Sequence, residues 1–266
     1  LHGPFFGVML SSIEDELRAA GKHVIITAGH SDEEVEKDSI QFLVSRQCDA
    51  LILHVYAVSD SYLLEQSAGP VPISLIGRDL PEMSDRCFTI DNEQGGYLAA
   101  KALIELGHRE LAYLAGPLWK SDAKGRLAGY RRALAEHGLV FDRKLLAEGN
   151  YQEASGRWAM EQLLRAGRPF SGLACGNDEM ATGAIAVARE QGMTIPDDLS
   201  VIGFDNVFFT RYMHPALSTI DYPIGEMGQM AARSVLRDVY GKSGLAIQNR
   251  FEPRLVRRAS VMEFAW

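Results

Sequence analysis

The sequence lacks any apolar stretch that approaches the ~20 residues needed to cross a bilayer, so no membrane partner is expected. Its first residues show no basic region followed by an apolar run, although a shortened start would remove such an export signal. Cys48, Cys87 and Cys175 are odd in number, far apart and without zinc-ligand spacing. A disulfide framework is therefore not expected, and the three thiols suit a reducing, cytoplasmic environment.

Basic residues are too few and too scattered to hold a polyanion. The chain carries 35 acidic and 27 basic residues, a net charge of −8, with no long basic run. Three arginines fall between positions 254 and 258, but Leu255 and Val256 separate them, which favours a solvated strand edge over a basic patch. Any contact with DNA is therefore expected to come from another segment of the protein.

Motifs of the common enzyme classes are also missing. There is no GxSxG, HExxH or GxGxxG, and the seven histidines form no defensible grouping with nucleophiles. Gly241-Lys242-Ser243 resembles the end of a phosphate-binding loop, yet Leu236 stands where that loop requires glycine. We therefore expect no catalytic residues, no metal site, no cofactor and no enzymatic activity.

What the chain does contain is a regular alternation of short apolar strands and amphipathic helices. With 266 residues, 47% of them hydrophobic, it is long enough for two lobes. The alternation is typical of parallel βαβ units and predicts an α/β fold. Strands are predicted over 23–27, 49–55, 71–76, 111–115, 172–175, 199–202 and 217–220, and helices over 4–20, 32–47, 93–106, 124–137, 153–166, 178–191 and 224–240.

Proline-containing breaks at 116–117, 221–223 and 252–253 divide this pattern. They predict one lobe from residues 1–116 and 223–250 and another from 117–222 and 251–266. The pattern begins with a helix, whereas a parallel-sheet lobe normally begins with a central strand. We therefore expect that a first strand is missing; the alternative is a lobe that truly starts with a helix.

The order of local motifs resembles the lactose/galactose repressor family along the whole chain. The galactose-repressor branch is the most similar, through motifs at 53–54, 86–87, 121–123 and 221–223. The family resemblance is carried by Pro4-Phe5-Phe6, Asp91 to Gly96, Glu105 to Arg109, Leu114 to Pro117, Arg126 to Tyr130, Gly176 to Ala181, Val201 to Asn206, Pro215 to Ile220 and Leu255 to Arg258.

This resemblance implies a two-lobed fold like that of periplasmic binding proteins, each lobe a parallel sheet flanked by helices. It implies the effector-binding and dimerisation core of a transcriptional repressor, with a small-molecule effector, a monosaccharide such as galactose. Operator DNA would be bound by an upstream helix-turn-helix domain absent from this chain, as part of a homodimer. Ligand would favour a closed arrangement that alters the spacing of the DNA-binding heads. A periplasmic sugar-binding protein of a transporter is the alternative.

Polar ligand contacts are expected just after the strands, because ligands of open parallel sheets lie outside the carboxyl ends. By resemblance Arg126 is the ligand-clamping arginine; the alternative is a helix-surface arginine paired with Asp122. Asp122 itself would accept sugar hydroxyls or cap its helix. Asn177 offers a donor and an acceptor, or caps the next helix, and Asp205 would accept hydroxyl protons or cap a turn.

Aromatic rings complete the predicted site, since the C–H face of a sugar packs on a ring. Phe6 and Phe5 are candidates, although phenylalanines that open an amphipathic helix are often core residues. By resemblance Tyr151 supplies the opposite ring and Tyr222 lies at the second crossing between the lobes. Arg78, after a strand, resembles a sugar-contacting arginine of periplasmic relatives.

Overall fold

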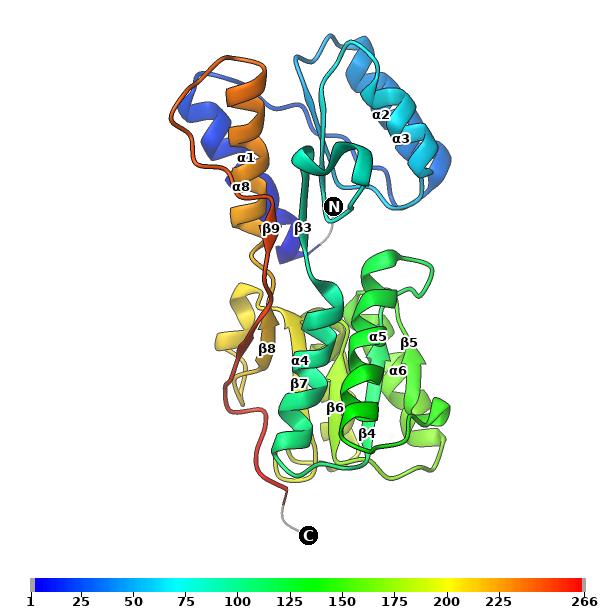
Figure 1. Cartoon of the computed structure of the whole chain (residues 1–266). Helices are drawn as coiled ribbons and strands as arrows, with labels where there is room; N and C mark the ends of the chain where they lie inside the picture. The colour runs from blue at the N-terminus through cyan, green and yellow to red at the C-terminus, as the bar shows by residue number, and fades with distance from the viewer. Residues whose placement is uncertain (1–2, 265–266) are drawn as a thin grey trace. The chain divides into compact units, whose positions relative to one another are not determined.

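The computed structural model describes residues 3–264, which form two compact units (Figure 1). Unit 1 comprises Leu1–Ile90 and Pro223–Phe251, and unit 2 comprises Asp91–Tyr222 and Glu252–Trp266. The first break thus lies after Ile90, earlier than the expected break at 116–117. The reason is that the helix and strand after Ile90 pack within unit 2, where the strand joins its sheet. Within residues 3–264, no helix is both long and apolar enough to span a bilayer.

Unit 1 is built on a four-stranded, all-parallel sheet in the order β1-β2-β3-β9. Helices α1 and α8 pack together, with α8 against β2 and β3, while residues of α2 and α3 join a separate apolar core with β1 and β2. Its elements are α1 (Pro4–Ala19), α2 (Glu33–Ser45), β1 (Leu51–Leu53), α3 (Asp60–Ser67), β2 (Ile73–Ile76), the 3-10 helix η1 (Pro81–Arg86), β3 (Cys87–Ile90), α8 (Ile224–Asp238) and β9 (Arg250–Phe251).

Helix α1 follows directly from its sequence pattern. Pro4 occupies the first turn, where the missing backbone N–H is not needed, and Met9, Ile13 and Leu17 bury one stripe. The chain leaves the helix through Gly21 at φ +72°, a left-handed conformation that favours glycine.

The strand predicted over 23–27 does not form in the structure, although its sequence is strongly β-prone. Ile25 and Ile26 are about half exposed, at 53% and 49%. A strand needs a hydrogen-bonded neighbour, and no described residue pairs with this segment in a sheet.

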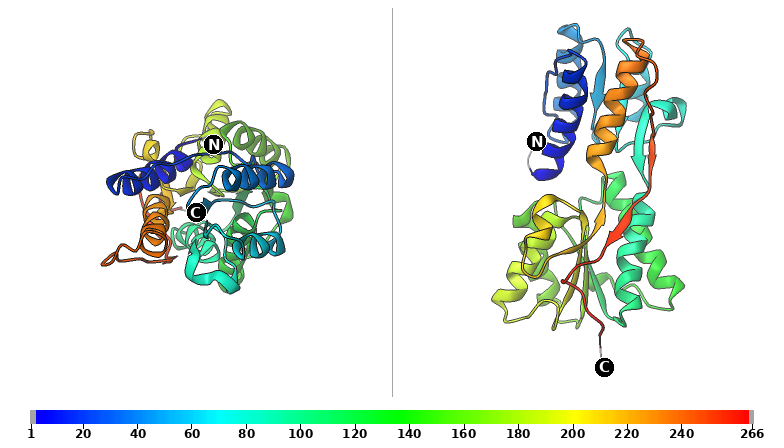
Figure 2. Two further views of the ribbon diagram at one scale, coloured as in Figure 1. Left: turned by 90° about the horizontal axis from the view of Figure 1, so that it is seen from above. Right: turned by 90° about the vertical axis from the view of Figure 1, so that its left-hand side faces the viewer.

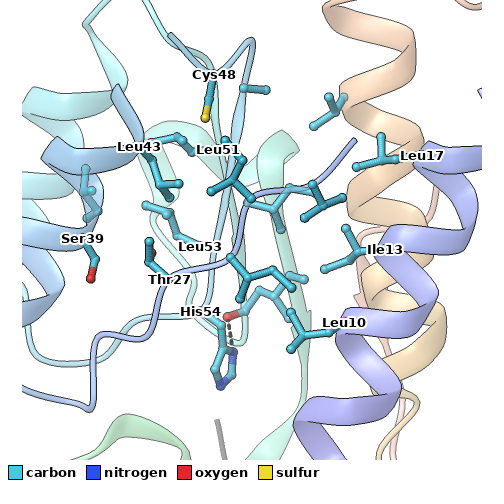
Figure 3. Close-up of a pocket in the computed structure, with 18 of the residues that line it drawn as sticks. Leu10, Ile13, Leu17, Thr27, Ser39, Leu43, Cys48, Leu51, Leu53 and His54 are labelled. Atoms are coloured by element: carbon cyan, nitrogen blue, oxygen red, sulfur yellow. Dashed lines mark hydrogen bonds between the residues drawn. The ribbon is translucent and has the colours of Figure 1, made fainter. Parts of the chain in front are cut away.

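An apolar cavity of about 370 Å³ lies beside this segment (Figure 3). It is bounded by α1, α2, β1 and the 23–27 segment, with Ile13 and Leu17 on one side and Leu43, Leu51 and Leu53 on another. All residues that line it belong to unit 1. The described residues do not test the first strand expected from the sequence, which stays a prediction.

Unit 2 is built on a six-stranded sheet in the order β10-β8-β7-β6-β4-β5, parallel except for β10. Helices α4 and α5 cover one face and α6 and α7 the other (Figure 2). Its elements are α4 (Asn92–Glu105), β4 (Leu111–Ala115), α5 (Ser121–Glu136), η2 (Arg143–Leu145), β5 (Leu146–Glu148), α6 (Glu153–Arg165), β6 (Gly172–Cys175), α7 (Asp178–Glu190), β7 (Ser200–Asp205), η3 (Phe208–Arg211), β8 (Ser218–Asp221) and β10 (Arg254–Val256).

Two glycines allow α4 and α5 to approach closely. A Cβ on Gly96 would lie 1.9 Å from the carbonyl oxygen of Arg126, and one on Gly129 would lie 1.7 Å from that of Glu93. This contact fixes α5, and with it Arg126, against the sheet of unit 2. The predicted α/β class with helix-flanked parallel sheets is confirmed.

Candidate ligand-binding site

Unit 2 brings six of the predicted site residues together. Asn177, Asp205 and Tyr222 come at or just after the carboxyl ends of β6, β7 and β8, which are neighbours in the sheet. Parallel strands end at the same edge, so these residues share one edge. Arg126 from α5, together with Tyr151 and Asp122, completes the group.

Arg126 lies at the centre of this group and is only 3% exposed. Its Nε donates to Asn92 Oδ1 at 2.9 Å, and its Nη1 donates to the Gly176 carbonyl at 2.5 Å. The guanidinium carbon lies 3.7 Å from the centroid of the Phe204 ring, a cation–π contact. This burial is not that of a helix-surface arginine, the alternative interpretation of the sequence.

The carboxylate facing Arg126 belongs to Asp205, whose Oδ1 lies 3.6 Å from Arg126 Nη1. Burial raises the pKa of Asp205 well above its usual range, and the nearby Arg126 charge opposes that rise. Burial would lower the pKa of Arg126, but the Tyr151, Asp205 and Asp122 side chains outweigh it and the pKa is raised.

Within residues 3–264, Asp205 Oδ1 is buried and accepts no hydrogen bond. A buried acceptor in this state costs about 1–3 kcal/mol unless a partner arrives. The turn-capping role considered for Asp205 is therefore not seen at this oxygen. A hydroxyl group placed beside it would remove the cost, which makes Oδ1 the most distinctive polar atom of the site.

Tyr151 and Asp122 form a second polar pair. The Tyr151 hydroxyl donates to Asp122 Oδ2 at 3.1 Å, and burial followed by the Asp122 charge raises the pKa of Tyr151. Asp122 lies in the first turn of α5, whose N-cap is Lys120, so Asp122 does not serve as the helix cap. The ring of Tyr151 needs Gly116 beneath it, because a Cβ there would lie 2.2 Å from ring atoms.

Asn177 does cap its helix, as the alternative interpretation held. Its Oδ1 accepts the Met180 N–H at 3.0 Å, while its Nδ2 donates to the Tyr151 carbonyl at 2.9 Å. The amide therefore joins α7 to the loop that carries Tyr151. Tyr222 is 4% exposed and its ring centroid lies 5.7 Å from the Arg126 guanidinium carbon.

The other three predicted residues lie in unit 1. Phe5 and Phe6 are partly buried rather than core residues, and their rings lie 5.5 Å apart. The Phe6 ring also lies 5.5 Å from that of His54, which contacts Tyr56 in turn. These four rings form an aromatic cluster.

Arg78, by contrast, is engaged within unit 1. Its Nη2 donates to Asp60 Oδ1 at 2.5 Å and its Nη1 to the Val58 carbonyl at 2.7 Å. A ligand would have to compete with these partners, so the sugar-contacting role of Arg78 receives no support from its contacts.

Sequence reasoning missed Phe204, Asn92 and His54 as neighbours of the candidate residues. Phe204 directly precedes Asp205 in β7, but every residue from Ser200 to Phe204 is buried, so no apolar–polar alternation marked its place beside Arg126. Asn92 lies on α4, and its contact with Arg126 depends on how α4 and α5 pack. No local pattern in the sequence encodes that packing.

Comparison with known proteins identifies the family. Residues 100–261 match a periplasmic binding protein-like domain. The chain is 39% identical over 97% of its length to the transcriptional regulator GalR of Escherichia coli K12, covering 75% of that protein. The chain belongs to the lactose/galactose repressor family of transcriptional regulators. This confirms the resemblance seen in the motifs, including that to the galactose-repressor branch.

Solved structures of the family share the fold of this regulator core. A transcriptional regulator of the LacI family from Burkholderia phymatum has a TM-score of 0.93 and 34% identity, over 98% of this chain and 96% of that one. A sugar-binding LacI-family regulator of Escherichia coli, complexed with phosphate, has a TM-score of 0.87 and 33% identity, over 98% and 94%. The chain is thus the ligand-responsive core of a transcriptional regulator and not, as the alternative held, a transporter's periplasmic binding protein.

Proposed function

We propose that this regulator core binds a small monosaccharide, with D-galactose as the first candidate, at the strand ends of unit 2. The observation that carries the proposal is the buried, unbonded Oδ1 of Asp205 beside Arg126. A sugar hydroxyl can donate to that oxygen while it accepts from a neighbouring donor. The 39% identity to GalR and the sugar-binding relative of known structure support this ligand class.

The remaining candidates have distinct roles in this proposal. Asp122 and Asn177 supply further acceptor and donor groups, and the rings of Tyr151 and Tyr222 offer apolar surface for a sugar's C–H face. Phe5 and Phe6 belong to unit 1, and we propose their rings as further apolar surface for a ligand of this class.

The response to ligand is proposed to reach DNA through a homodimer. Relatives carry the designation HTH-type and extend beyond this chain, which spans about three quarters of their length. We propose that a helix-turn-helix segment outside these 266 residues binds operator DNA in the cytoplasm. Ligand binding would change the spacing of two such segments, because half-sites on DNA require a fixed separation. Binding without turnover is sufficient for this function.

The test is calorimetric titration of the chain with D-galactose and a panel of other monosaccharides and their phosphates. A ligand present at 100 times its dissociation constant stabilises the folded state by about 2.7 kcal/mol, so a thermal-shift screen can precede the titration. Asp205→Asn should weaken binding at least about tenfold, because the amide replaces a carboxylate acceptor of a charge-assisted hydrogen bond. Glu190→Gln, at the exposed end of α7, is the matched control.

Saturable binding of a monosaccharide that Asp205→Asn weakens and Glu190→Gln leaves unchanged supports the proposal. Binding that Asp205→Asn leaves unaltered would show that the sugar lies elsewhere. No heat with any sugar of the panel would refute the ligand class, and product formed during incubation would refute binding without turnover.

A further inference from the structure

Asp178 is a buried carboxylate within the 176–181 motif, and neither the sequence analysis nor the proposed ligand contacts give it a role. It is the first residue of α7 and is 0% exposed. Its Oδ1 accepts the Thr219 hydroxyl at 2.6 Å and its Oδ2 accepts the Val207 N–H at 3.0 Å. Thr219 lies on β8 and Val207 in the turn that follows β7, so the carboxylate joins α7 to that strand and that turn.

That turn has an unusual backbone. Asp205 has φ +107° and Asn206 has φ +56°, two consecutive residues with side chains in a region that favours glycine. Such conformations persist only where the surrounding contacts fix them. Here the strained residue Asp205 is also the one whose carboxylate faces Arg126.

Asn206 is held from three directions. Its Nδ2 donates to Asp221 Oδ1 at 2.7 Å, its Oδ1 accepts Arg258 Nη2 at 2.6 Å, and its backbone N–H reaches Thr219 Oγ1 at 3.3 Å. Thr219 is the residue whose hydroxyl donates to Asp178. The two sets of contacts therefore form one hydrogen-bonded network around the turn.

The backbone of β7 is shaped around the same carboxylate. A Cβ added to Gly203 would lie 2.1 Å from Asp178 Oδ1, so a glycine is needed where the strand passes. Burial raises the pKa of Asp178 to about 7, opposed by its hydrogen bonds with Thr219 and Val207. Burial disfavours the charged form of this carboxyl group, yet Gly203 leaves room for it. We therefore expect Asp178 to have a specific structural role in unit 2.

We propose that Asp178 is a positioning residue for the ligand site, which fixes the strained turn of Asp205 and Asn206 and thereby holds the Asp205 carboxylate in its unbonded position beside Arg126. This inference rests on the proposed function for its ligand. Its structural half, the fixing of the turn, concerns unit 2 alone and needs no ligand.

The experiment compares Asp178→Ala with Asp178→Asn and with the control Glu190→Gln in the full chain. Hydrogen exchange of the ligand-free protein is the first readout, because Val207 loses its acceptor only in Asp178→Ala. We expect its amide to exchange at least about tenfold faster there, with the rest of the sheet unchanged. The asparagine variant retains an acceptor for Val207 and should restore slow exchange.

Affinity for D-galactose is the second readout, in a double-mutant cycle with Asp205→Asn. A positioning residue acts through Asp205, so Asp178→Ala should weaken binding about tenfold in the natural chain and less than about twofold in the Asp205→Asn chain. Unchanged exchange at Val207 would overturn the proposal. So would faster exchange throughout unit 2, or an equal loss of affinity in both chains, since these indicate general loosening.

Failure of the proposed function looks different. If D-galactose does not bind, or binds independently of Asp205, the exchange measurement alone decides whether Asp178 fixes the turn. If Asp205→Asn weakens binding and Asp178→Ala does not, the ligand site stands and the positioning role is refuted.

Discussion

Replacing Arg126 by methionine removes the buried charge at the centre of the candidate site while keeping most of the side-chain volume. Asn92 and the Gly176 carbonyl each lose a donor, and the Asp205 carboxylate loses the positive charge 3.6 Å away. Removing one partner of a buried ion pair costs about 3–5 kcal/mol, because the other charge stays buried without compensation. We therefore expect Arg126→Met to lower the free energy of unfolding by about 3–5 kcal/mol at neutral pH.

The pH dependence of that loss follows from Asp205. Burial raises the folded-state pKa of Asp205 above the 3.8 of an exposed aspartate. A raised carboxyl pKa adds to the free energy of unfolding below about pH 4, and this stabilisation is lost as pH rises towards the folded-state pKa. The positive charge of Arg126 lowers the folded-state pKa of Asp205 and so reduces the stability that is lost as pH rises. The deficit of Arg126→Met should therefore be small near pH 4 and grow towards neutral pH.

Urea unfolding followed by tryptophan fluorescence measures this effect where it arises, since Trp119 and Trp158 both lie in unit 2. The double variant with Asp205→Asn is the control, because removing the carboxylate as well should recover part of the loss. A loss below about 1 kcal/mol in Arg126→Met, or an undiminished loss in the double variant, would refute the buried pairing described for the site.

Three further predictions concern the scaffold. Glu36→Ala should cost about 2–3 kcal/mol by circular dichroism, because its buried carboxylate accepts the N–H groups of residues 56, 57 and 58; an unchanged stability contradicts this. Gly96→Ala should lower the free energy of unfolding in urea by more than about 3 kcal/mol, because α4 and α5 must separate to admit the methyl group. Gly7→Ala is the control: Gly7 has open space around it, so the alanine should raise the free energy of unfolding by roughly 0.5–1 kcal/mol. If a further strand fills the cavity of unit 1, about six alternating valines and threonines added before Leu1 should slow amide exchange at Ile25, and a proline-containing extension should not.

The fold was largely predictable because its helices and strands are encoded locally. Asp32 before an acidic first turn predicts the start of α2, and the structure shows Asp32 capping the Glu34 and Val35 N–H groups. The short strands β3 and β5 and helix α3 were not predicted, since elements this brief carry too few residues for a clear period. The segment 23–27 shows the opposite failure, where a strong strand signal lacks a partner to pair with.

The sequence named six candidate residues that the structure brings together in unit 2, but it did not predict their contacts. Arg126, Asp205 and Asn177 each follow a strand or a crossing, which is a local feature of the sequence. That Asp205 Oδ1 stays unbonded, or that Arg126 stacks on Phe204, depends on the approach of α5 to β7 across residues distant in sequence. The contacts of Arg78 with Asp60 and the Val58 carbonyl likewise depend on the folding of unit 1, and its sugar-contacting role stays a prediction.

The apolar cavity of unit 1 changes how a ligand screen on this chain should be interpreted. A cavity of this size can take up a small molecule, and any compound bound only by the folded state raises the melting temperature. A buffer additive or aromatic compound lodged among Ile13, Leu17 and Leu51 would thus appear as a hit, although it touches no residue of unit 2. A shift that persists in Asp205→Asn reports the cavity, and a shift that disappears reports the candidate site.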